Sequence, residues 1–235
     1  MSAPSFEKSL QDIVGSQNVR PDEPLVDHTT FRIGGPAQWL VTPRSEDEVA
    51  GVVSTCEAAG IPWRVLGLGS NVLAPDEGLD GVTLLLADNF AAVEVLPGGL
   101  VRAAAGATNA AVAAAARDAG LAGYEFASGI PGTIGGAAIM NAGAYGGELK
   151  DVLVETHYLT QAGQKGIRRG EEQHLGYRTS AFSSGHEIII GGVLKLQSSD
   201  PAAIQARMEE LAEKRRSKQP LEYPSAGSTF KRPAD

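Results

Sequence analysis

The sequence predicts a protein of mixed helices and strands that forms one large domain or two small ones. From Phe31 onward, segments with strand-like and helix-like patterns alternate along the chain. A glycine-dense stretch then separates this part from two longer strand-like segments, 152–160 and 187–196, so a second unit is expected to begin near Asp151. The chain has 235 residues and is 43% hydrophobic, which is enough to bury a substantial core.

The first half of the chain begins with a helix and continues with alternating elements. Phe6 and Leu10 lie on one side of an amphipathic helix within residues 1 to 20, which leads into a proline-containing arm. Ser45 is expected to cap a second helix, with Glu48 completing a capping box and Gly60 ending the helix. The expected strands are 37–42, 63–68, 82–87, 93–96 and 100–104, the last two forming a hairpin around Pro97-Gly98-Gly99.

The second half contains two further expected helices. Thr108 or Asn109 caps an alanine-rich helix that ends at Gly120. A last helix begins at Asp200, followed by a proline in the first helical position, and runs through Arg216. The sequence after this helix is rich in turn-forming residues.

Composition excludes several classes of protein. The formal charge of −8 disfavours nucleic acid as a partner, because a phosphate backbone attracts basic surfaces. A single cysteine, Cys56, rules out an internal disulfide, and the scattered histidines indicate no metal site. No apolar run is long enough to span a bilayer, so a soluble intracellular protein is expected. The 29 glycines are unusually many and are a first indication of a cofactor.

The first glycine-rich segment is Gly67-Leu68-Gly69-Ser70-Asn71, directly after an expected strand. Small residues in this position leave backbone amides exposed, which suits an anion or a cofactor phosphate. A tight turn explains the same pattern equally well. The segment is not a dinucleotide fingerprint, because Val72 stands where the third glycine would be.

The second glycine-rich segment runs from Gly129 to Gly147. Its glycines alternate with apolar residues, so we expect an irregular and internal stretch of backbone. Buried irregular backbone needs hydrogen-bond acceptors, and a pyrophosphate would supply several. The alternative is a glycine-rich structural crossover without a ligand.

A third group of polar residues includes Arg178 and Ser228. Ser228 has no Gly-x-Ser-x-Gly surroundings and no nearby histidine, so hydrolase chemistry is poorly supported. Residue chemistry alone favours a turn or cap hydroxyl for Ser228 and a surface ion pair for Arg178.

Together these segments closely resemble the UDP-N-acetylenolpyruvoylglucosamine reductases, and the similarity covers nearly the whole chain after residue 25. The specific features are the order and spacing of the motifs, and the run KQPLEYPSAGS at 218–228 resembles the shorter of two subtypes. The matching motifs are TTFRIGG at 29–35, GLGSN at 67–71, the segment 129–147, Tyr177-Arg178 and GSTFK at 227–231.

The resemblance places the protein in the α+β class and implies a two-part FAD-binding domain of the vanillyl-alcohol-oxidase/PCMH type, followed by the start of a smaller α+β substrate domain. The implied divisions are an N-terminal helix and arm at 1–25, the FAD-binding domain at 26–197 with an internal break near 88–105 or 151, and the start of the substrate domain at 198–235.

The resemblance also implies the chemistry. Non-covalent FAD is reduced by NADPH, which then leaves, and the UDP-sugar substrate enters the same cleft of a monomeric cytoplasmic enzyme. Arg178 and Ser228 are the implied catalytic residues, and Tyr177 and Lys218 are expected to contact the substrate. The implied FAD-binding residues are Gly67, Leu68, Gly69, Ser70, Asn71, Gly129, Pro131, Gly132, Thr133, Gly135, Gly136, Asn141, Ala142, Gly143 and Tyr145.

One departure from the family concerns the end of the sequence. Relatives continue further and carry a catalytic glutamate there, whereas this sequence stops at Asp235. A truncated chain that binds flavin but turns over slowly or not at all is therefore expected. Two rival functions are another FAD-dependent oxidase or dehydrogenase of the same fold and a non-catalytic flavin-binding module.

Overall fold

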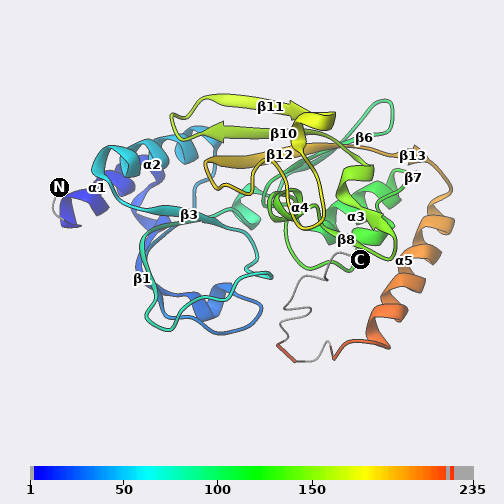
Figure 1. Cartoon of the computed structure of the whole chain (residues 1–235), viewed down its shortest axis with the longest axis horizontal. Helices are drawn as coiled ribbons and strands as arrows, with labels where there is room; N and C mark the ends of the chain where they lie inside the picture. The colour runs from blue at the N-terminus through cyan, green and yellow to red at the C-terminus, as the bar shows by residue number, and fades with distance from the viewer. Residues whose placement is uncertain (1–2, 221–222, 225–235) are drawn as a thin grey trace.

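Two β-sheets organise the computed structural model, which describes residues 3–220, 223 and 224 (Figure 1). Sheet one has β1 antiparallel to β2, while β2, β4 and β3 run parallel. Parallel strands bring their carboxyl ends to one edge, so the loops that follow them gather there. In spatial order, sheet one contains β1 (Val19–Pro24), β2 (Pro36–Val41), β4 (Leu79–Leu85) and β3 (Trp63–Leu66).

Sheet two is antiparallel throughout and is formed by later segments of the chain. Its strands in spatial order are β11 (Lys165–Arg169), β10 (Leu153–Thr160), β12 (Glu187–Lys195), β6 (Leu100–Ala104) and β5 (Val93–Leu96). Two small pairs complete the strands of the described chain: β7 (Leu121–Ala122) with β13 (Gln197–Ser198), and β8 (Gly143–Ala144) with β9 (Gly147–Glu148).

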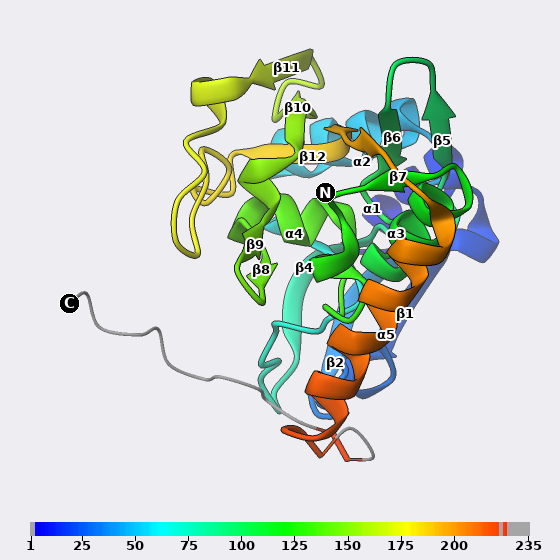
Figure 2. The same ribbon diagram turned by 90° about the vertical axis from the view of Figure 1, so that its right-hand side faces the viewer.

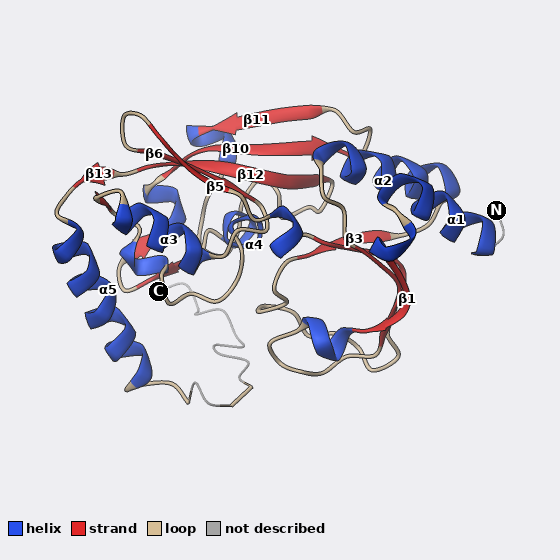
Figure 3. Ribbon diagram, turned by 180° about the vertical axis from the view of Figure 1, so that it is seen from behind, coloured by secondary structure: helices blue, strands red, loops and turns tan. Residues whose placement is uncertain are grey.

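Among the described residues, five α-helices surround these sheets (Figure 3). One hydrophobic core runs through both sheets, and the apolar sides of the first three helices pack into it. No helix in the described ranges combines the length and apolarity needed to cross a membrane. The helices are α1 (Ala3–Val14), α2 (Glu46–Ala59), α3 (Asn109–Asp118), α4 (Ile134–Met140) and α5 (Pro201–Arg216).

The residues that begin and end α2 are the ones predicted from the sequence, except in one detail. The Glu48 amide donates to the Ser45 hydroxyl at 3.2 Å, and Gly60 ends the helix in a left-handed conformation. The predicted capping box is wrong in its second half. The Glu48 carboxylate accepts from the amide of Arg44, at 2.7 Å, one residue before the cap.

The predicted hairpin and the remaining helix starts are confirmed. β5 and β6 pair from Val93 with Ala103 to Leu96 with Leu100. Thr108, rather than Asn109, caps α3 by accepting a hydrogen bond from the Ala111 amide at 3.0 Å. The second glycine-rich segment is less irregular than predicted, because α4 forms inside it.

Candidate functional site

The segment Gly67–Asn71 leaves the carboxyl end of β3 through a space that has no room for side chains. A Cβ atom on Gly67 would lie 2.6 Å from the Thr133 hydroxyl oxygen. Gly69 has a φ of +59°, and a Cβ there would lie 2.2 Å from the carbonyl oxygen of His28. Glycine is therefore required at both positions, because a side chain would collide with packed neighbours.

The two glycine-rich segments are fastened to each other. The Ser70 hydroxyl donates a hydrogen bond to the carbonyl oxygen of Pro131 at 3.0 Å. Gly132, with a φ of +125°, passes so close that a Cβ would lie 3.0 Å from the Ser70 hydroxyl oxygen. Segments about sixty residues apart in the sequence thus form one continuous backbone surface.

Several backbone amides on this surface donate to no protein acceptor within the described part of the chain. These are the amides of residues 67–71 together with those of Gly132 and Thr133. The adjacent amides of Ile134 and Gly135 are satisfied, by the carbonyl oxygens of Ala107 at 2.9 Å and Ala105 at 2.8 Å. Clustered donors without protein acceptors form a concave anion-binding surface.

Asn109 and Tyr124 support the second segment from beneath, and the sequence reasoning missed both roles. The Asn109 side-chain amide donates to the Ile130 carbonyl oxygen at 3.2 Å, and its backbone amide donates to the Gly132 carbonyl oxygen at 3.1 Å. The Tyr124 hydroxyl donates to the Asn109 side-chain oxygen at 2.8 Å. Burial raises the pKa of Tyr124, which stays a neutral donor. The sequence feature that could have indicated this supporting role is a single asparagine on the apolar side of an alanine-rich helix.

A cavity of about 840 Å³ opens over this surface. The carboxyl-terminal end of α5 lines the cavity with Arg215 and Arg216. Figure 2 shows the course of α5 along one side of the molecule. Arg216 is paired with Glu213 at 2.6 Å. A volume in this range is typical of sites for ligands of cofactor size, and the amides and arginines favour an anionic group.

The far end of α4 carries the other predicted site residues. A helix of seven residues is about 10 Å long, so this end is separated from the amide surface by roughly that distance. The tight turn between β8 and β9 has Tyr145 at a φ of 55° and Gly146 at 88°. Beside it, the backbones of Gly176 and Thr179 bond to each other and close a second tight turn.

Tyr177 and Arg178 form the tip of this second turn. Arg178 has a φ of 56°, and its guanidinium carbon lies 5.4 Å from the centre of the Tyr177 ring. The structure thus brings Tyr145, Tyr177 and Arg178 to one end of α4 and the amide surface to the other. Asn141 lies between the two turns, and both of its side-chain N–H groups are donated to protein acceptors.

Lys218 and Ser228 are the other residues predicted to take part in substrate binding and catalysis. Lys218 is exposed just after α5 and is not among the residues that line the 840 Å³ cavity. Ser228 lies outside the described residues. The roles assigned to these two residues, and to the remaining site residues, stay predictions.

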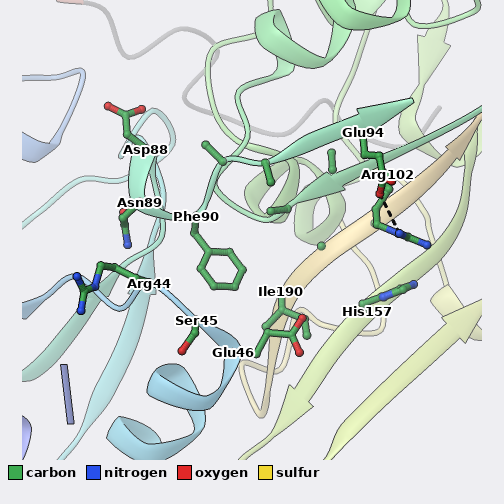
Figure 4. Close-up of a pocket in the computed structure, with 16 residues that line it drawn as sticks. Arg44, Ser45, Glu46, Asp88, Asn89, Phe90, Glu94, Arg102, His157 and Ile190 are labelled. Atoms are coloured by element: carbon green, nitrogen blue, oxygen red, sulfur yellow. Dashed lines mark hydrogen bonds and ion pairs between the residues drawn. The ribbon is translucent and has the colours of Figure 1, made fainter. Parts of the chain in front are cut away.

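A second cavity, of about 650 Å³, lies elsewhere and lacks these features (Figure 4). Phe90 and Ile190 contribute apolar surface, and the arginines in its lining already have acidic partners. The pairs are Arg102 with Glu94 at 3.0 Å and Arg44 with Glu48 at 3.6 Å, and the His157 ring nitrogen lies 3.0 Å from the Glu155 carboxylate. The glycine-lined cavity is the stronger candidate, because it adjoins backbone amides that donate to no protein acceptor in the described part of the chain.

Comparison with known proteins identifies the class. Residues 37–165, which include both the 67–71 loop and the 129–147 segment, match the family model described as FAD binding domain. A 4-ethylphenol oxidase from Gulosibacter chungangensis has the same fold, with a TM-score of 0.62 at 18% identity over 84% of this chain and 44% of that one. The protein is therefore a flavoprotein with an FAD-binding domain of this α+β fold, as predicted.

Closer relatives define the family. The UDP-N-acetylenolpyruvoylglucosamine reductase of Syntrophomonas wolfei is 43% identical over 223 residues, which cover 95% of this chain and 74% of the relative. The crystal structure of the corresponding reductase from Thermus caldophilus superposes with a TM-score of 0.77 at 36% identity, covering 92% of this chain and 76% of that one. The chain belongs to the UDP-N-acetylenolpyruvoylglucosamine reductase family, and the predicted resemblance is confirmed.

Proposed function

We propose that this chain reduces UDP-N-acetylenolpyruvoylglucosamine to UDP-N-acetylmuramate with NADPH and non-covalent FAD, in the cytoplasmic synthesis of peptidoglycan precursors. The observation that carries the proposal is the pair of glycine-rich segments, fastened by Ser70, in a chain whose family has this activity. The resulting product supports cell shape and division. We further propose a monomer with the divisions 1–25, 26–197 and 198–235.

The residues present fit FAD. The amides of the Gly67–Asn71 loop and of Gly132 and Thr133 would hold its two phosphates, because they lie on two segments joined by Ser70 and donate to no protein acceptor in the described chain. Gly129, Pro131, Gly135 and Gly136 shape the same segment. The group at the other end of α4, including Tyr145 with Ala142 and Gly143, would face the ring system. Bound FAD supplies hydride transfer between NADPH and the substrate.

Arg178 would hold the substrate carboxylate. Addition of hydride to the enolpyruvyl double bond places negative charge on the neighbouring carbon and its carboxylate. A guanidinium is always charged and forks toward two oxygens, so it stabilises that state more than the ground state. Tyr177 stacks against this guanidinium and restricts its direction.

Ser228 would deliver the proton that completes the product, and Lys218 would contact the substrate diphosphate. A serine hydroxyl is a weak acid, so this step requires a strongly basic carbon next to it. NADPH and the sugar nucleotide would use the same cleft in turn, which explains why the sequence carries no separate dinucleotide fingerprint.

Two half-reactions test the proposal. In stopped-flow mixing, NADPH should bleach the flavin absorbance of the FAD-loaded protein, and UDP-N-acetylenolpyruvoylglucosamine should then restore it under anaerobic conditions. Ser228→Ala should leave the bleaching step intact and slow the restoration. Reoxidation of the bleached flavin by another small-molecule acceptor but not by the sugar nucleotide would favour another oxidoreductase of this fold, and no bleaching would favour a non-catalytic flavin-binding module.

A further inference from the structure

Asn141 ends α4 with a side chain that is entirely engaged by protein. The residue is 2% exposed and adopts the left-handed conformation, with a φ of 41°. Its side-chain nitrogen donates to the Glu148 carboxylate at 3.0 Å and to the Gly176 carbonyl oxygen at 3.1 Å. Its side-chain oxygen accepts from the Lys150 amide at 2.9 Å. One amide group therefore connects the end of α4 to two other segments, 148–150 and the one that contains Gly176.

Each of these segments carries or supports a turn at the end of α4. Gly176 is the first residue of the turn whose tip bears Arg178, and that turn is closed by the reciprocal bonds between Gly176 and Thr179. Glu148 ends β9 and so anchors the turn that bears Tyr145. Lys150 follows β9 and pairs with Glu148 at 2.7 Å.

The base of the Arg178 segment is anchored independently. Gln173, 1% exposed, donates to the Leu153 carbonyl oxygen at 3.1 Å, and its own carbonyl oxygen accepts from the Ala181 amide at 2.9 Å. These bonds fix where the segment leaves and rejoins sheet two. The hydrogen bond from the Asn141 side chain to Gly176 fixes the turn nearer its tip.

We propose that Asn141 is a positioning residue that holds the Arg178 turn and the Tyr145 turn in fixed relation to α4, and thereby to the cofactor surface at the other end of that helix. The inference rests on the proposed function for what Arg178 does with substrate. With both amide hydrogens donated to protein, Asn141 acts through its neighbours. Its left-handed backbone conformation, which asparagine tolerates better than most residues, directs the side chain between the two turns.

Asn141→Gly is the sharpest test, because glycine keeps the left-handed backbone while removing the side chain. His174→Gly is the matched control: His174 lies in the same segment as Arg178, is exposed and also has a positive φ of 45°. Trypsin cleavage after Arg178 in the FAD-loaded native protein reports opening of the turn without depending on activity. The two half-reactions report its effect on chemistry.

We expect Asn141→Gly to be cleaved after Arg178 about tenfold faster than wild type and His174→Gly, since one hydrogen bond at the turn is lost. FAD affinity and bleaching by NADPH should change less than about threefold, whereas restoration by substrate should slow about tenfold or more. Asn141→Asp, which keeps the acceptor and loses both donors, should show the same pattern if the glycine variant does not fold.

Unchanged cleavage and unchanged restoration in both variants would overturn the proposal. A loss of FAD affinity with normal cleavage would also overturn it, because Asn141 would then be a direct cofactor ligand. Failure of the wild-type protein to be restored by the sugar nucleotide would instead contradict the proposed function, and the cleavage comparison would still decide whether Asn141 holds the turn.

Discussion

At Gly67 the site has no room for a side chain larger than a hydrogen atom. A methyl group there would overlap the Thr133 hydroxyl oxygen at 2.6 Å, and the methyl carbon of Thr133 is 3.3 Å away. Either the loop or α4 would have to move. Both carry the amides proposed to hold the phosphates, so the collision would disturb cofactor binding more than the core.

Gly67→Ala should therefore raise the dissociation constant of FAD at least about tenfold, because displaced amides no longer converge. Thr133→Ala removes the two atoms that the added methyl group would meet first. The double variant should recover most of the affinity, with Thr133→Ala alone as the control. Fluorescence titration of FAD measures all three, and a double variant no better than Gly67→Ala would refute the steric explanation.

The Glu148 carboxyl is a second single residue with a testable effect, because its ionisation makes folding stability depend on pH. A hydrogen bond from Lys150, together with Asn141 and the charge of Arg178, holds the pKa of the Glu148 carboxyl below its usual range. A lowered folded-state pKa means that the ionised form contributes stability above the unfolded pKa of about 4.3, and this contribution disappears as pH falls through the lower folded value.

The melting temperature of Glu148→Gln should accordingly lie below that of wild type by a constant amount between about pH 6 and 8. The gap should close as the pH falls below about 4.3. Thermal melts of the two proteins across this range measure it. A gap that instead closed on raising the pH toward about 8 would contradict the assigned ion pair.

At the scale of elements, the second glycine-rich segment depends on a buried hydrogen bond beneath it. Tyr124→Phe would leave the Asn109 side-chain oxygen buried without its donor, which costs about 1–3 kcal/mol of folding stability. Urea unfolding should show this loss, together with weaker FAD binding. Tyr158→Phe is the control, because that hydroxyl donates no hydrogen bond to the part of the chain that the structure describes. Equal free energies of unfolding for the two variants would show that Tyr124 does not stabilise the second glycine-rich segment.

Sequence patterns predicted the elements that local chemistry decides. Ser45 and Gly60 set the ends of α2, and the Pro97-Gly98-Gly99 turn set the hairpin, since capping and turn residues act over a few positions. β1 was predicted as an arm because it contains Pro21 and Pro24. It forms a strand because it lies at the edge of sheet one, where prolines are tolerated. That position depends on tertiary packing and cannot be predicted from the local sequence.

α4 was missed for a related reason. Glycines in a seven-residue stretch argue against a helix by propensity. In the folded chain, Gly135 lets the helix approach Ala105, where a Cβ would lie 3.1 Å from that methyl group. The motifs at 67–71 and 129–147 were found from sequence, but Asn109, Tyr124 and the role of Asn141 depend on contacts between segments that sequence spacing does not show.

At the scale of the whole molecule, the candidate site joins two parts of the chain. The 67–71 loop belongs to sheet one, the 129–147 segment packs beneath sheet two, and α5 closes the cavity. A ligand held by both segments should therefore stabilise the entire fold. At about a hundredfold excess over its dissociation constant, such a ligand contributes about 2.7 kcal/mol, or roughly 5–10 °C in melting temperature for a chain of this size.

The most direct test is the amount of flavin that the purified protein binds. After reconstitution with FAD and gel filtration, absorbance should show one oxidised flavin per chain, with the rise in melting temperature given above. Denaturation should release the flavin into the filtrate, because it is held without a covalent bond. A protein that stays colourless after reconstitution, with an unchanged melting temperature, would contradict the central claim that the two glycine-rich segments bind the phosphates of FAD.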